Sequence, residues 1–170
     1  MNTTRSPIPE ADLYRFEYSI ELDVTDRRGR VLVVMKNPSY PDERNICFAK
    51  AAAWARQRDF GAVDFANLFA RRAYDPRELN ALAYEDAVGV HNDYMIGLLA
   101  DDADLVIAAW GQPSGIRSAW YERRVRDVVD VIGADRLTAL GTTSAGHPKH
   151  PQVWSNSWTP SDWRVPGLRS

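Results

Sequence analysis

Two asparagines, two histidines and a lysine are the residues whose types are suited to chemistry on a nucleobase. Asn37 follows one apolar run of the chain, and Asn67 follows the next. His147 and His150 lie in a segment rich in glycine and proline, on either side of Lys149. A carboxamide offers one acceptor and two donors and can read a base edge, whereas a histidine can donate to an oxygen that gains negative charge. This set predicts base recognition in one shared crevice.

The asparagines, and the tryptophan that follows the third apolar run, also have simpler structural interpretations. An Asn-Pro pair such as Asn37-Pro38 usually forms a turn, Asn67 can hold a loop in place, and Trp110 can be a core residue. His91 and the two other histidines lack a spacing typical of metal ligands. No acidic pair, P-loop or GxGxxG follows an apolar run, which excludes two-carboxylate glycosidase chemistry and both nucleotide-binding fingerprints. We expect no metal and no cofactor.

Four apolar runs must position these residues, and helical patterns separate them. The runs cover 31–35, 63–66, 105–109 and 137–140, and helices are expected at about 43–58, from near His91 and at about 118–132. Strands that alternate with helices predict a parallel sheet covered on both faces, which is an α/β three-layer sandwich. Ligands of such sheets bind at the carboxyl ends of the strands, where the candidate residues fall.

The flanking segments add expectations about local structure. Residues 14–22 alternate apolar and polar side chains, which predicts a half-buried N-terminal antiparallel strand with Arg15 on its polar face. Residues 25–29 are expected to form a turn, and residues 74–76 a loop. In the first predicted helix, Ile46 is expected to face the core.

Length and composition bound the domain organisation and the class of protein. The 170 residues are 45% hydrophobic and 26% charged, which is typical of one soluble domain. We expect a loose arm at 1–12, a single α/β domain at 13–151, and a tail at 152–170 whose tryptophans pack on the domain without forming a strand. Without an apolar run of about 18 residues or a signal peptide, a cytoplasmic monomer with no membrane segment is expected. The single cysteine, Cys47, excludes a disulfide framework.

Charge indicates the kind of partner. A net charge of −2 and a pI near 5.9 argue against a strongly adhesive nucleic-acid binder. A local basic face remains, because several arginines lie on or beside the helix predicted at 118–132. We expect Arg117, Arg124 and Lys149 to contact a nucleic-acid backbone. Acidic neighbours such as Glu122 favour the alternative, a solvated helix face.

Several motifs together resemble a known family of bacterial and phage proteins. They are Asn37-Pro38-Ser39, Asn67-Leu68-Phe69-Ala70, Gly89 with Asn92-Asp93, Ala109-Trp110-Gly111 and Gly146-His147-Pro148-Lys149-His150-Pro151. From about Val31 to Pro151 the chain is similar to the family designated domain of unknown function 1643. This resemblance implies no activity.

The order of the same motifs resembles, more distantly, the uracil-DNA glycosylase superfamily. That superfamily has a three-layer α/β fold with a short, mainly parallel sheet. An Asn-Pro-Gly version of its first motif resembles residues 37–39, which implies that Asn37 positions the attacking water and that Pro38 lies against the base. Asn67 falls where the superfamily places a base-reading asparagine, and residues 109–111 resemble its Leu-Trp-Gly strand end.

The closing segment resembles the His-Pro-Ser motif of the same superfamily, which supplies a histidine to the base O2 and backbone to a phosphate. Two registers fit, one beginning at His147 and one at His150, and the sequence leaves both open. The resemblance further implies that the backbone at Gly146 contacts a phosphate. The strongest members carry an aspartate where Asn37 stands, so activation of water by a carboxylate is not expected here.

The resemblance also implies which bases would fit. Where the uracil-specific enzymes carry a tyrosine that blocks 5-substituted pyrimidines, this chain has the small Ser39. We therefore expect a pocket that tolerates 5-modified pyrimidines, with Phe48 and Trp110 as candidate stacking residues. The expected function is a DNA glycosylase-like protein that recognises a flipped pyrimidine, with excision as a further expectation. The alternatives are a non-catalytic module that binds modified nucleic acid and an enzyme acting on free nucleosides or nucleotides.

Overall fold

The computed structural model describes residues 5–22, 29–42 and 45–167. Of the turn predicted at 25–29, only Gly29 falls within these ranges. The predicted start of the first helix near residue 43 also lies outside them, as do both ends of the chain.

The described strands form one six-stranded sheet in the order β1-β3-β2-β4-β5-β6. Their bounds are β1 Tyr18–Glu21, β2 Arg30–Met35, β3 Ala62–Asn67, β4 Leu105–Ala108, β5 Leu137–Ala139 and β6 Ser161–Asp162. The four central strands are parallel, whereas β1 runs antiparallel to β3 and β6 runs antiparallel to β5. This confirms the predicted α/β fold with a mainly parallel sheet and an N-terminal antiparallel strand.

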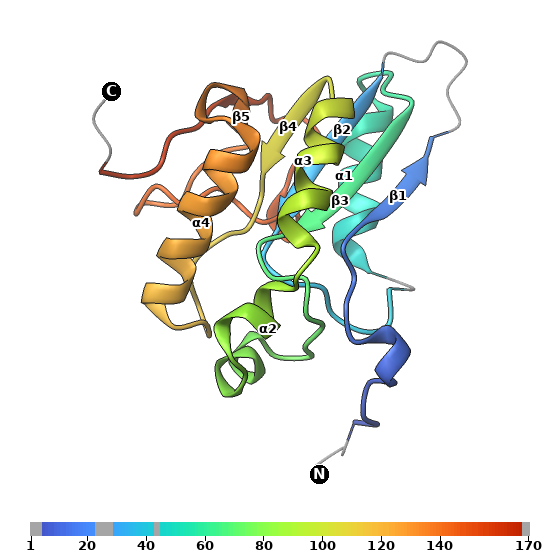
Figure 1. Cartoon of the computed structure of the whole chain (residues 1–170). Helices are drawn as coiled ribbons and strands as arrows, with labels where there is room; N and C mark the ends of the chain where they lie inside the picture. Colours follow the sequence, from blue (N-terminus) through green and yellow to red (C-terminus); the bar gives the residue numbers. More distant parts are fainter. Residues whose placement is uncertain (1–4, 23–28, 43–44, 168–170) are drawn as a thin grey trace.

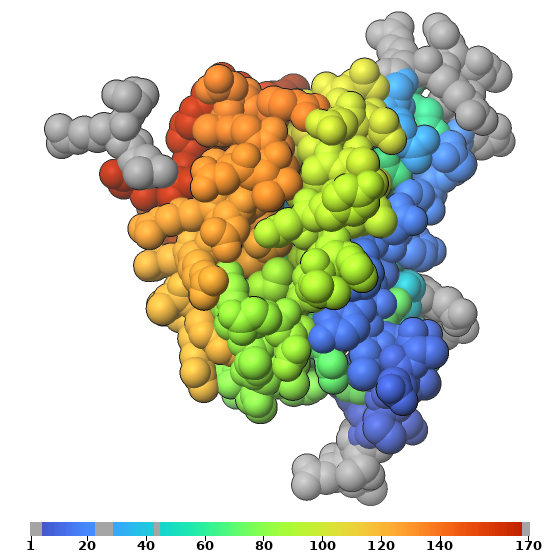
Figure 2. All heavy atoms as spheres, in the orientation of Figure 1, coloured from blue at the N-terminus to red at the C-terminus, as the bar shows by residue number. Residues whose placement is uncertain are grey.

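Helices cover both faces of the sheet and make it the middle of three layers (Figure 1). The α-helices are α1 Ile46–Arg56, α2 Tyr84–Val88, α3 Asn92–Asp102 and α4 Ser118–Ile132, and the 3₁₀ helices are η1 Glu10–Asp12, η2 Pro76–Ala81, η3 Ala134–Arg136 and η4 Pro151–Val153. α1 lies on one face of the sheet. α3 and α4 lie on the other face, where Figure 2 shows them side by side at the surface.

β2 is apolar on both sides because each side is covered. Val31 and Val33 belong to the buried cluster on the α1 face, whereas Leu32 and Val34 belong to the cluster under α3 and α4. All four side chains are at most 1% exposed. A central strand of a parallel sheet has this pattern, since burial on both faces removes the alternation with polar residues.

The N-terminal strand is shorter than the sequence predicts. The alternation covers residues 14–22, but β1 begins only at Tyr18, and Tyr14 makes an isolated bridge. The backbone N–H of Arg15 donates to the carbonyl of Ala70, outside the β1–β3 ladder. The alternation of faces therefore does not extend to Arg15, whose side chain is 5% exposed instead of lying on the solvent face.

Two local expectations are wrong. The sequence predicts no strand in the tail, but the tail contains β6, which pairs with β5. The tail residues Trp154 and Trp163 are buried in clusters on opposite faces of the sheet. Residues 74 and 75 form a loop as expected, and η2 begins at Pro76. Ile46 is the first residue of α1 and is 56% exposed, so it does not face the core.

Candidate functional site

The ends of the four parallel strands lie in a row at the lower edge of the sheet in Figure 1. Met35 at the end of β2 pairs with Asn67 at the end of β3, and Val34 pairs with Ala108 at the end of β4. The segments that follow extend this row, since Gly111 N–H donates to the carbonyl of Pro148. We call this row the strand-end edge; its residues are 36–39, 67–69, 109–111 and 140–150.

The structure divides the predicted site residues between two sides of this edge. His150 lies on the α1 side, because its Nδ1 is 3.7 Å from the Sγ of Cys47 in the first turn of α1. His147 lies on the α4 side, where its ring meets the ring of Tyr121 at 5.8 Å. The two histidines therefore do not share one crevice, and the two registers left open by the sequence correspond to two different places.

Asn67 is the most isolated polar side chain on the α1 side. It follows Val63 and Phe65 on the α1 face by the alternation of β3. The residue is 1% exposed, and neither its Oδ1 nor its Nδ2 has a hydrogen-bond partner among the described residues. Leaving such a buried group unpaired costs roughly 1–3 kcal/mol. Its backbone is fixed, because the buried Asn92 donates from Nδ2 to the Asn67 carbonyl at 3.0 Å.

The Asn-Pro-Ser segment begins two residues after Met35, which pairs with Asn67 between β2 and β3. Asn37 donates from Nδ2 to the carbonyl of Pro38 at 3.2 Å and to that of Ala73 at 3.5 Å. This geometry leaves Oδ1 as the atom that can accept a hydrogen bond from a ligand or a water. Pro38 is buried, whereas Ser39 is exposed and its carbonyl accepts from Arg72 at 2.7 Å.

His150 is held as a neutral imidazole. Burial, assisted by the charge of Lys36, lowers the pKa of His150 from 6.5 to about 4. The backbone N–H of Gln152 donates to His150 Nδ1 at 3.4 Å, so the ring hydrogen lies on Nε2, which is a donor. Burial also lowers the pKa of Lys36, whose Nζ donates to the carbonyl of Ser114 at 3.4 Å.

An ion-pair cluster that the sequence did not reveal borders the same side. The carboxylate of Asp42 accepts from both terminal nitrogens of Arg72 at 2.8 and 2.9 Å, and it also accepts from Nη1 of Arg15. Burial alone would raise the pKa of Asp42, but the hydrogen bonds from both arginines outweigh it and lower the pKa. Asp42 is therefore ionised and occupied, and it cannot serve as a free general base.

Phe48 belongs to the core of this side. Its ring stacks on Tyr18 at 4.4 Å and meets Phe65 at 4.5 Å. The guanidinium of Arg15 lies 4.9 Å from the ring centroid. Phe48 is only 5% exposed, so in this conformation its ring offers no open face to a base.

The α4 side contains a pocket of about 300 Å³. Its lining includes Trp110, Tyr121, His147 and Trp163. Trp110 is fully buried, its ring meets that of Trp163 edge to face at 5.2 Å, and its Nε1 has no partner among the described residues. Trp163 donates from Nε1 to the carbonyl of Gly146 at 3.0 Å, so the Gly146 carbonyl is bonded to the tail.

The basic residues predicted to meet a nucleic-acid backbone have different environments. Arg117 is exposed and donates to the carbonyl of Asn80 at 3.1 Å. The Nζ of Lys149 lies 4.8 Å from the ring centroid of Trp158. Arg124 is 1% exposed and donates to the carbonyl of Leu68 and to Asp93, so its expected place on the surface is wrong.

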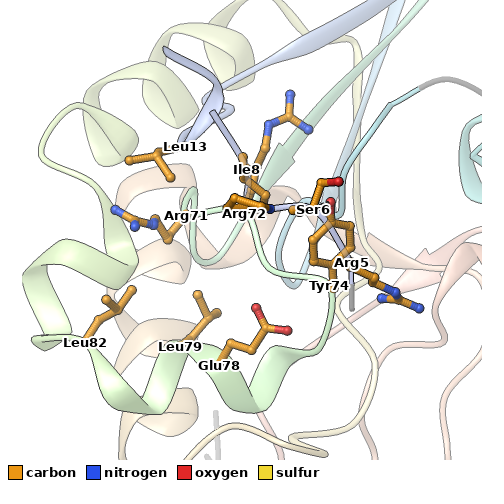
Figure 3. Close-up of a pocket in the computed structure, with 11 residues that line it drawn as sticks. Arg5, Ser6, Ile8, Leu13, Arg71, Arg72, Tyr74, Glu78, Leu79 and Leu82 are labelled. Carbon is orange, nitrogen blue, oxygen red and sulfur yellow. Dashed lines mark hydrogen bonds between the residues drawn. The ribbon is translucent and has the colours of Figure 1, made fainter. Parts of the chain in front are cut away.

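A second pocket, of about 520 Å³, lies between the N-terminal arm and η2 (Figure 3). Three arginines line it, but Figure 3 shows their guanidinium groups pointing in different directions. That of Arg72 turns away from the pocket, toward its ion pair with Asp42. This pocket therefore does not gather positive charge around one point.

The fold and the strand-end edge define the class: an α/β protein with a three-layer sandwich and unpartnered polar groups where parallel strands end. Residues 17–152 match a family described as a protein of unknown function (DUF1643), and the chain belongs to that family. Neither a curated protein nor a solved structure matches the chain. Within the described ranges, no helix is long and apolar enough to cross a membrane, and no cluster of metal-ligating side chains forms.

Proposed function

We propose that this chain is a DNA glycosylase-like protein that receives a flipped pyrimidine on the α1 side of the strand-end edge. The observation that carries the proposal is the carboxamide of Asn67, which is 1% exposed and unpartnered among the described residues. A buried polar group without a partner is costly, and a ligand with matching donors and acceptors removes that cost.

The carboxamide suits the edge of a pyrimidine. Its Oδ1 accepts from the N3–H of uracil while its Nδ2 donates to O4. Rotation of the amide by half a turn reverses this pattern and matches N3 and the amino group of cytosine. The backbone of Asn67 is anchored by Asn92, so the reading group stays in place while a base enters.

His150 is the histidine assigned to the base in this proposal. At neutral pH its imidazole is uncharged, because burial lowers its pKa to about 4, and its hydrogen lies on Nε2. When the N-glycosidic bond breaks, the bonding electron pair moves onto the base, and O2 becomes more negative. A preorganised donor at that oxygen is worth about 10²–10³ in rate.

Hydrolysis further requires a water at C1′ of the sugar. Asn37 is suited to orient it through Oδ1, since its Nδ2 is already bonded to backbone carbonyls. The water oxygen forms the new bond to C1′ as the base leaves, and one water proton is released to solvent or to the base. Asp42 is paired with two arginines and supplies no general base, so excision is slow unless the base is a good leaving group.

A second candidate function is a reader that binds the same base without excising it. The engagement of Asp42 by Arg15 and Arg72 favours this candidate, because the carboxylate that follows the Asn-Pro-Ser segment is then unavailable to the water. The two functions share the base site and differ only in the cleavage step.

The test is an abasic-site assay on single- and double-stranded oligonucleotides that contain uracil, cytosine, thymine mismatches or 5-hydroxymethyl pyrimidines. We expect cleavage of at least one base by the wild type, loss of cleavage in Asn67→Ala, and weaker cleavage in Asn67→Asp, whose carboxylate can accept from the base but cannot donate to it. The exposed Asn156→Ala is the matched control and should retain activity.

The outcomes separate the candidates. Binding without cleavage, lost in Asn67→Ala, would support the reader. Activity or binding that survives in Asn67→Ala would contradict the proposed base site, and so would the absence of both binding and cleavage on every probe.

A further inference from the structure

Arg15 has an unused hydrogen-bonding edge inside the protein. Its Nη1 donates to Asp42, but its Nε and Nη2 have no partner among the described residues. These two nitrogens lie along one edge of the planar guanidinium and form a fork that matches two oxygens of a carboxylate or phosphate. The residue is 5% exposed, so water does not freely solvate this fork.

The charges around Arg15 do not balance in the described part of the chain. Arg15 and Arg72 share the single carboxylate of Asp42. The Nε of Arg72 is also buried and unpartnered. Phe48 and Tyr18 face the Arg15 guanidinium at 4.9 and 5.8 Å, which offsets part of the charge but leaves the nitrogens in the plane unsatisfied. Burial accordingly lowers the pKa of Arg15, since the charged form is poorly solvated there.

Two aromatic rings connect the fork to the strand that carries the base-reading carboxamide. The ring of Phe48 lies 4.9 Å from the Arg15 guanidinium and 4.5 Å from the ring of Phe65. Phe65 stands two residues before Asn67 on the same face of β3. Phe48 lies in the first turn of α1, where the side chain of the N-cap residue Asn45 accepts from the N–H of Cys47. The N-terminus of a helix is the positive end of its dipole, which adds to the attraction for an anion.

We propose that Arg15 binds an oxyanion of the ligand that Asn67 reads, so that the preferred ligand is a pyrimidine carrying a phosphate or a carboxylate. The inference rests on the proposed function in assigning both groups to one ligand. Because the fork is buried beside Phe48, a small nucleotide or an anionic base substituent reaches it more readily than a phosphate of duplex DNA does.

The experiment measures ligand affinity by isothermal titration calorimetry, with thermal shifts as a second readout. The probes are 2′-deoxyuridine, its 5′-monophosphate, uracil, 5-carboxyuracil, and inorganic phosphate alone. Comparison of the monophosphate with the nucleoside tests a phosphate on the sugar, whereas 5-carboxyuracil against uracil tests a carboxylate on the base. The variant is Arg15→Lys, which keeps the charge and loses the fork, and the matched control is the exposed Arg56→Lys.

We expect one anionic probe to bind at least about tenfold more tightly than its neutral counterpart, a preference that Arg15→Lys removes and Arg56→Lys retains. An equal preference in wild type and Arg15→Lys would overturn the inference, and so would the lack of any anionic preference in the wild type. Neutral bases that bind through Asn67 without an anionic preference would leave the proposed function standing. Phosphate that binds through Arg15 while no base binds would refute the proposed function and the assignment of both groups to one ligand, and would leave Arg15 as an anion site only.

Discussion

The α1 side and the α4 side of the strand-end edge differ in their buried polar groups without hydrogen-bond partners and in how tightly they are packed. On the α1 side, the carboxamide of Asn67 and the fork of Arg15 are buried without partners in tightly packed surroundings. On the α4 side, an open pocket of about 300 Å³ has four aromatic rings in its lining, and the unpartnered atom among its lining residues is Nε1 of Trp110. The α1 side therefore has unpartnered donors and an unpartnered acceptor, as reading a base requires, whereas the pocket on the α4 side has one unpartnered donor.

The two histidines show how three residues of sequence separate the two sides. Thr142 and Pro148 form an isolated bridge, and the carbonyl of Pro148 accepts from Gly111. This anchor fixes the segment between His147 and His150, so that one ring contacts Tyr121 and the other contacts α1. Two residues that are close in sequence can therefore lie on opposite sides of the strand-end edge.

The largest expected effect separates the histidines by activity. His150→Ala should lower the rate of base excision by about 10²–10³, because it removes the donor to the base oxygen. His147→Ala should change that rate less than about threefold, since a residue outside the site contributes little. Single-turnover rates of abasic-site formation measure both. An equal loss of excision rate in the two variants would contradict the assignment of the base to the α1 side alone.

A smaller effect concerns the dependence of stability on pH. The unfolded chain protonates this histidine below about 6.5, whereas in the folded state burial lowers the pKa of His150 to about 4. The stability that neutral His150 contributes is therefore present above pH 6.5 and is lost as the pH falls toward 4, by about 1–3 kcal/mol.

The measurement is denaturant unfolding at pH 7.0 and pH 4.5 for the wild type and His150→Gln. His150→Gln should lose less stability between the two pH values than the wild type does. A pH dependence that is unchanged in His150→Gln would show that the imidazole is not held neutral by its surroundings.

The smallest effect belongs to the α4 side. Trp110→Phe removes the unpartnered Nε1 and keeps an aromatic ring, so the gain from the removed polar group and the loss of packing nearly cancel, within about 1 kcal/mol. Base binding should not change. Chemical denaturation and the binding assay check both expectations, and weaker base binding in Trp110→Phe would assign the base to the α4 side instead.

The sheet was predictable because its signals are local. The apolar run of β2 and the alternation around β1 identify a doubly covered strand and a half-buried strand without knowledge of any contact. β6 has only two residues and exists through its pairing with β5, so no local pattern predicts it. η2 did carry a signal, since Asp75 and Glu78 form a capping box around Pro76.

The site was predictable only in part. Asn37, Asn67 and the histidines could be named because polar residues after strand patterns fall at one edge of a parallel sheet. The side of the edge on which each residue lies depends on tertiary contacts, so it could not be predicted from the sequence. Arg15 was missed because the alternating pattern assigns it to the solvent face, whereas the strand pairing begins three residues later.

The most direct test of the base site compares Asn67→Leu with the wild type in binding and in stability. Leucine has nearly the shape of asparagine, so removal of a buried unpartnered carboxamide should leave the free energy of unfolding unchanged or raise it. Binding is measured by fluorescence anisotropy with a single-stranded oligonucleotide that carries one 2′-deoxyuridine, against the same strand with a tetrahydrofuran abasic analogue. We predict that the wild type prefers the uracil strand and that Asn67→Leu, equally stable, binds both strands alike. A retained preference for uracil in Asn67→Leu, or a large loss of stability in that variant, would contradict the assignment of Asn67 as the base-reading residue.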